Sequence, residues 1–117
     1  MAYELQSQAA ETQPIIVERA AASLPQTTTT PYFTVTGRVL ITNIIGEVTT
    51  IIENATNNIK LISNPTVGAD VDLCATVDID TDAVGTLYTI TGTLADAMVA
   101  TTSGAVPNQA SAILMTD

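Results

Sequence analysis

Between Phe33 and Ile41, apolar residues or glycine occupy every second position of the chain, and polar residues occupy most of the positions between them. Only Leu40 interrupts this alternation. A period of two places successive side chains on opposite faces of an extended backbone, so the pattern predicts a half-buried β-strand. Val39 and Ile41 are expected on its inner face and Arg38 on its outer face.

Further runs of β-branched and apolar residues predict more strands. They cover residues 44–52, 59–62, 70–80, 87–93 and 110–115. In the first of these runs, Gly46 predicts a bulge or a bend. The run over 70–80 alternates most regularly, and it places Cys74 on the polar face, opposite Leu73. The strand over 87–93 is expected to pair with its predecessor as a hairpin.

Turn residues separate these runs, for example the Asn-rich segment 54–58 and the sequence Ser63-Asn64-Pro65. Residues 94–99 fit either a short helical turn or a strand. The chain is 46% hydrophobic and only 13% charged, which predicts a packed core. Many short strands between turns are typical of an all-β fold, and we expect a small sandwich or barrel over residues 32–117.

Residues 1–31 have a different composition, rich in Ala, Gln, Pro and Thr, and are expected to form an extended N-terminal arm. Pro14 could begin a short helix that Pro25 would end, but a helix of this length is marginal in water. The Thr run before Pro31 favours an extended backbone instead. The apolar cluster Ile15-Ile16-Val17 indicates docking on a partner, because apolar side chains are not buried on a tail that stays in water.

The charge of the chain is strongly negative, with three basic and twelve acidic residues and a net charge of −9. The electrostatic field of a chain with this charge repels phosphate backbones and anionic lipid surfaces, so binding to nucleic acid or to a membrane is not expected. The N-terminal residues lack the pattern of a secretory signal. No run approaches the roughly 18 apolar residues of a membrane span. We therefore expect a protein that is made in the cytoplasm.

The residue types that most often carry catalysis are scarce. The chain has no His, which removes the usual proton shuttle and the commonest zinc ligand. Its one Cys, Cys74, has no base or cation nearby in the sequence, and a lone Cys in an apolar run is usually a small core residue. Glycine-rich phosphate loops are absent from the sequence. The prediction is a protein that is not an enzyme and that has no cofactor.

The strongest candidate for a functional site is an acidic cluster with D-x-D-x-D spacing, which resembles the spacing of the first ligands in a calcium-binding loop. It consists of Asp78, Asp80 and Asp82. The resemblance fails downstream, where Ala83 replaces the loop glycine and Thr89 replaces the bidentate Glu. We prefer a solvated acidic face that discourages edge-to-edge pairing, with a weak cation site and a small metal-dependent hydrolase as the alternatives.

Four segments resemble a family of short proteins of tailed bacteriophages that are presumed virion proteins. The segments are TVTGRVLIT (34–42), GEVTT (46–50), NPTVGADVDLCATVDI (64–79) and GTLYTITGTLADAMV (85–99). The resemblance covers residues 33–104 and does not reach the N-terminal arm. The family supplies no catalytic residues.

The resemblance implies a structural virion protein, and a capsid decoration or cement protein fits the residues best. It would lie on the capsid surface, bind the major capsid protein and associate with itself, most simply as a homotrimer. Ile15, Ile16 and Val17 are the expected anchors of the arm, while Tyr32 and Phe33 would define where the arm joins the β domain. The alternative is a receptor- or host-surface-binding module of a head or tail fibre, which would need an exposed aromatic patch.

Overall fold

The computed structural model describes residues 15–25 and 28–117. The chain divides into two compact units, Met1–Tyr32 and Phe33–Asp117. Tyr32 therefore belongs to the first unit and Phe33 to the second. Pro14, the expected start of a short helix, lies outside the described residues.

All regular structure in the described residues is strand, and these residues form no helix, so the all-β prediction is confirmed. The strands are β1 (Arg38–Ile41), β2 (Ile45–Glu47), β3 (Asn58–Ile59), β4 (Ile62–Ser63), β5 (Val71–Asp72), β6 (Val77–Asp78), β7 (Leu87–Thr89), β8 (Val99–Thr101) and β9 (Ile113–Thr116). They form one three-stranded sheet, β2-β7-β8, and three two-stranded sheets, β1-β9, β3-β6 and β4-β5. A sandwich or a barrel stays a prediction.

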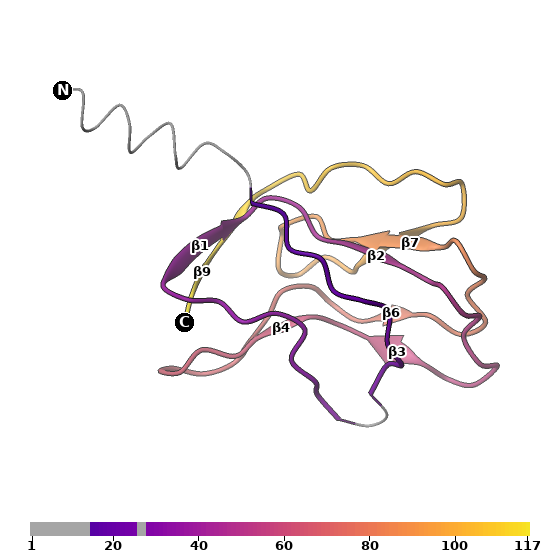
Figure 1. Cartoon of the computed structure of the whole chain (residues 1–117), viewed down its shortest axis with the longest axis horizontal. Helices are drawn as coiled ribbons and strands as arrows, with labels where there is room; N and C mark the ends of the chain where they lie inside the picture. The colour runs from indigo at the N-terminus through magenta and orange to yellow at the C-terminus, as the bar shows by residue number, and fades with distance from the viewer. Residues whose placement is uncertain (1–14, 26–27) are drawn as a thin grey trace. The chain divides into compact units, whose positions relative to one another are not determined.

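Three of these sheets contain successive parts of one long, interrupted hairpin, in which residues 45–63 run antiparallel to residues 71–89 (Figure 1). Backbone hydrogen bonds continue the pairing between the strands. Val48 N donates to Thr86 O at 3.0 Å, and Ile52 N donates to Asp82 O at 3.1 Å. Further along, Leu73 N donates to a carbonyl just before β4 at 2.8 Å. The hairpin turns at residues 64–70, where proline and glycine end the strands.

This arrangement corrects the expected hairpin between residues 70–80 and 87–93. Strand β7 pairs with β2 on one side and β8 on the other, and it has no ladder with β5 or β6. The chain does not form a hairpin at the turn after Asp82. The strands before and after this turn, β6 and β7, both pair with the same earlier segment of the chain, which contains β2 and β3. Residues 94–99 contain a turn at 94–95, and β8 begins at Val99.

The expected strand over residues 70–80 is divided into β5 and β6, which have different partners. Between them, Leu73 and Cys74 are both buried although they are adjacent in the sequence. Ala75 forms a parallel bridge with Ala97, and its N–H donates to Asp96 O at 2.8 Å. The backbone therefore leaves the hairpin ladder at this point, and the placement of Cys74 on the polar face was wrong.

The core lies around the middle of the hairpin and the strand β7. Its buried residues are Val48, Cys74, Ile79, Tyr88, Ile90 and Met98. Two threonines, Thr86 and Thr89, are also buried, and their hydroxyls donate to the carbonyls of Ala83 and Ile44, each at 2.7 Å. These bonds satisfy hydroxyl groups that would be costly to bury unpaired.

Gly46 forms no bulge, contrary to expectation. It pairs in register with Tyr88, between the neighbouring pairs of the β2-β7 ladder. A Cβ atom at Gly46 would lie 3.8 Å from Tyr88 Cδ2, an ordinary van der Waals distance, so the Tyr88 ring does not by itself require a glycine there.

Candidate interaction surfaces

Among the described residues of the first unit, the expected arm anchors are the most exposed cluster of apolar side chains. Ile15 is 90% exposed, Ile16 82% and Val17 66%. Residues 15–25 form neither helix nor strand. The helical alternative therefore does not hold for the described part of the arm, and three adjacent apolar side chains face solvent there.

Arg19 closes a loop within the first unit. Its Nη1 atom donates to the carbonyl oxygens of Pro31 at 3.0 Å and Tyr32 at 3.1 Å. The guanidinium also lies over the Tyr32 ring, 4.8 Å from the centroid, where the ring face attracts a cation. The local sequence pattern gives no sign of this contact, because Arg19 and Pro31 lie 12 positions apart. Tyr32 is half-buried, whereas Phe33 is 52% exposed.

The acidic cluster is not assembled into a cation site. Asp78 Oδ1 accepts a hydrogen bond from Asp80 N at 2.9 Å, and Asp80 Oδ1 accepts one from Ala55 N at 2.9 Å. Asp82 Oδ2 accepts the phenolic hydrogen of Tyr88. The described residues contain no group of three or more potential metal ligands. Strand β6 ends at Asp78, so Asp80 lies in a turn and the expected shared strand face does not exist.

Tyr88 and Asp82 form a polar contact at the edge of the core. Tyr88 is 7% exposed. Its burial raises the pKa of the phenol well above the usual value, and the hydrogen bond to Asp82 and the charge of that carboxylate raise it further. The phenol therefore stays protonated and holds the turn around Asp82 against β7, which is a structural role.

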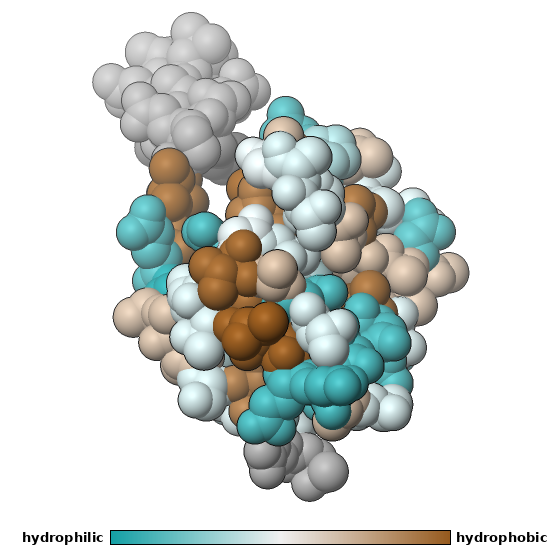
Figure 2. All heavy atoms as spheres, turned by 90° about the vertical axis from the view of Figure 1, so that its right-hand side faces the viewer, coloured by the Kyte–Doolittle hydropathy of each residue, from teal (hydrophilic) through white to brown (hydrophobic). Residues whose placement is uncertain are grey.

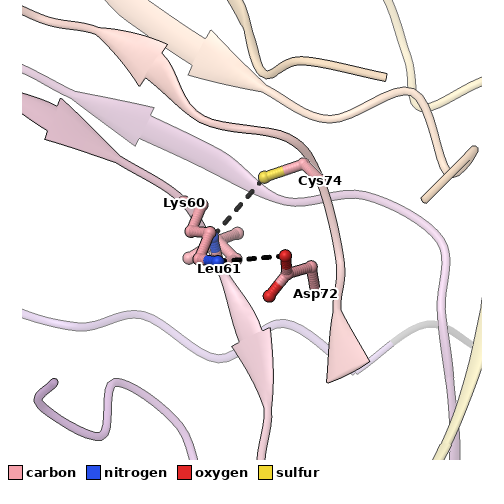
Figure 3. A network of polar contacts seen from close by, with 4 residues as sticks. All are labelled: Lys60, Leu61, Asp72 and Cys74. Carbon is pink, nitrogen blue, oxygen red and sulfur yellow. Dashed lines mark hydrogen bonds and ion pairs between the residues drawn. The ribbon is translucent and has the colours of Figure 1, made fainter. Parts of the chain in front are cut away.

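Cys74 is 1% exposed and lies among apolar side chains, as the prediction of a core cysteine required. Its Sγ accepts a weak hydrogen bond from Leu61 N at 3.5 Å (Figure 3). Beside it, Lys60 Nζ donates to Asp72 Oδ2 at 3.0 Å. Both partners of this ion pair are substantially exposed, so its contribution to stability is small.

The antiparallel pair β1-β9 has two distinct faces, and we call it the terminal ribbon. Its half-buried face carries Val39, Ile41, Ile113 and Met115, and its exposed face carries Arg38, Leu40, Leu114 and Thr116. Leu40 and Leu114 are directly opposite each other and are 59% and 58% exposed. The residue that broke the alternation in the sequence therefore has an apolar cross-strand neighbour on the outer face.

Gln109 holds the two strands of the ribbon together at one end. Its Nε2 atom donates to Ile41 O at 3.1 Å and to Ser111 O at 2.7 Å. The side chain is buried, and its Oε1 atom has no hydrogen-bond partner among the described residues. At the other end, Asp117 Oδ2 accepts from Gly37 N at 3.1 Å, and Asp117 N donates to Gly37 O at 3.1 Å.

Apolar residues are unevenly distributed on the surface. On the face drawn in Figure 2 they gather into a brown patch that borders a hydrophilic area. Among the exposed apolar residues of the second unit, Ile51 and Val84 belong to the two limbs of the hairpin, and Val67 lies at its turn. The described residues include no helix of the length and apolarity needed to cross a membrane.

Comparisons of the chain with protein-family models, with curated proteins and with solved structures found no match.

Proposed function

We propose that this protein is a structural component of a bacteriophage virion, a decoration or cement protein that stabilises the head by binding capsid subunits. The observation that carries the proposal is the exposed apolar run Ile15-Ile16-Val17, which is 66% to 90% exposed in a segment without helix or strand. Exposing three adjacent β-branched side chains is unfavourable in water unless a partner covers them.

The chemistry of this run fits strand addition to the edge of a partner's sheet. An extended segment can supply main-chain hydrogen bonds to an exposed edge, while alternate side chains enter apolar pockets. In such a contact Ile15 and Val17 would point to one side and Ile16 to the other. The Arg19 contact to Pro31 and Tyr32 supports this, because it ties the chain just after the run and leaves the run itself exposed.

The resemblance to presumed virion proteins of tailed phages supports the choice of partner, the major capsid protein, and of location, the capsid surface. Cys74 is buried in the core and the carboxylates of Asp78, Asp80 and Asp82 accept hydrogen bonds within the domain, which suits a structural protein. A homotrimer stays a prediction.

The test is co-sedimentation of the full chain with purified shells of the major capsid protein of the phage that encodes it. Replacing Ile15, Ile16 and Val17 together by Ser should abolish sedimentation, because the main chain alone gives too little burial. Val84→Ser is the matched control, since Val84 is 63% exposed but belongs to the second unit, and it should sediment like the unaltered chain. Undiminished binding of the triple variant would refute the role of the run.

The second candidate is a module of a fibre that binds a host surface. The turn of the long hairpin offers it an exposed tip, because Val67 is 85% exposed there and residues 66–70 are all exposed, but this tip contains no aromatic residue for the expected aromatic patch. Quantitative mass spectrometry of purified virions separates the two candidates. A copy number comparable to that of the major capsid protein supports the decoration protein, and a few copies per particle support the fibre module.

A further inference from the structure

Arg19 binds two kinds of group at the base of the arm. Its guanidinium donates to the carbonyl oxygens of Pro31 and Tyr32, at 3.0 Å and 3.1 Å, and lies 4.8 Å from the centroid of the Tyr32 ring. Pro31 fixes its own φ angle and restricts the residue before it, so the backbone that offers these carbonyls is stiff. We call these contacts the Arg19 clasp. All of its members belong to the first unit.

The Arg19 clasp shortens the arm. Arg19 and Tyr32 lie 13 positions apart, and an extended chain of that length spans about 45 Å. In the closed clasp the same two residues are joined across a single arginine side chain. The apolar run Ile15-Ile16-Val17 ends just before Arg19 in the sequence. The clasp therefore confines the run to a small volume around Tyr32.

The clasp presents the run and does not cover it. With the clasp closed, Ile15, Ile16 and Val17 are 66% to 90% exposed, so their side chains are available to a partner. A segment that is already held near its docking position loses less freedom when it binds. The effective concentration of a tethered segment also falls as its tether lengthens. A closed clasp should therefore raise the affinity of the run for a docking site close to Tyr32.

We propose that Arg19 is a positioning residue of the arm, and that the closed clasp sets which docking sites the run can reach. The inference rests on the proposed function, in which the run docks on capsid subunits. With the clasp closed, the run docks beside the place where Tyr32 meets the shell and does not extend to a distant subunit.

The first test detects the clasp in the free chain, without any shell. An aromatic ring moves the NMR signals of protons above its face upfield, so the side-chain methylene protons of Arg19 should be shifted upfield in the full chain. The shift should disappear in Tyr32→Ala and persist in Tyr32→Phe, which keeps the ring. Equal Arg19 chemical shifts in the unaltered chain and in Tyr32→Ala would overturn the proposal.

The second test measures the affinity for shells of the major capsid protein by co-sedimentation over a range of shell concentrations. Arg19→Ala and Tyr32→Ala should each weaken binding by about 2- to 10-fold, the range expected for a cation on an exposed ring with its hydrogen bonds. The double variant should bind no more weakly than the weaker single variant, because both changes remove the same clasp. Tyr32→Phe should bind like the unaltered chain.

Arg38→Ala is the matched control, because Arg38 is also an exposed arginine but belongs to the second unit. It removes the same charge and should bind like the unaltered chain. Equal weakening by Arg38→Ala and Arg19→Ala, or additive losses in the double variant, would overturn the clasp. If the triple Ser variant of the run loses binding while Arg19→Ala does not, the clasp has no role and the proposed function stands. If the unaltered chain does not sediment with shells, the proposed function fails and this inference fails with it.

Discussion

Gly92→Ala tests the packing of the chain between β7 and β9 most directly. Gly92 has φ +90°, and a Cβ atom there would lie 1.8 Å from Ser111 O and 2.6 Å from Ser111 C. Both atoms are backbone, so no side-chain rotation relieves the overlap. Ser111 is also held firmly, because its N–H donates to Thr91 O at 2.9 Å and its carbonyl accepts from Gln109 Nε2 at 2.7 Å.

Two costs follow from this geometry. A positive φ strains any residue with a Cβ atom by about 1–3 kcal/mol. Displacing Ser111 breaks its two hydrogen bonds, each worth about 0.5–1.5 kcal/mol. Gly92→Ala should therefore lower the free energy of unfolding by about 3–5 kcal/mol, a large part of the roughly 5–15 kcal/mol that holds a small protein folded.

Gly104→Ala separates the two costs. Gly104 has a similar φ of +80°, but a Cβ atom there meets nothing within 4 Å. It should show the strain alone, so the two variants should differ by roughly 2 kcal/mol. Urea unfolding followed by far-UV circular dichroism measures both, provided that the dependence on urea is unchanged. Equal losses in the two variants, to within about 0.5 kcal/mol, would refute the close approach of Gly92 to Ser111.

Two further predictions concern the turn between β6 and β7. Because burial and Asp82 raise the pKa of Tyr88, its neutral form stabilises the fold below about pH 10, the pKa of an unfolded tyrosine, and this contribution is lost as the pH rises further. Above about pH 10, melting temperatures should therefore fall more steeply for the unaltered chain than for Tyr88→Phe, whereas the two curves should be parallel at lower pH. Curves that stay parallel above about pH 10 would contradict the raised pKa. Thr81 has φ 58°, which is unfavourable for a β-branched residue, so Thr81→Asn should raise the free energy of unfolding by about 0.5–1 kcal/mol in the same urea experiment. A lower value would mean that the Thr81 hydroxyl, which donates to Asp80 O at 2.6 Å, matters more than the strain.

The sequence by itself determined the fold class and the two faces of β1. The period of two around Val39 and Ile41 was sufficient, because alternation of side chains is a property of any extended backbone and needs no knowledge of partners. It also indicated that Cys74 belongs to the core, and it placed the apolar run of the arm. The exposure of Ile15 in the structure agrees with a side chain that has no partner among the described residues of its own unit.

Only the tertiary structure decided which strands pair. The alternation over residues 70–80 predicted one strand, but the chain leaves the ladder at Leu73 and Cys74 and forms a bridge from Ala75 to Ala97. The acidic spacing of Asp78 and Asp80 suggested a common face, which the end of β6 removes. Strand partners depend on contacts between distant segments, and a local period carries no information about them. The exposed face of the terminal ribbon could not be predicted from a local period either. Leu40 and Leu114 become neighbours on it only when the two ends of the β domain pair.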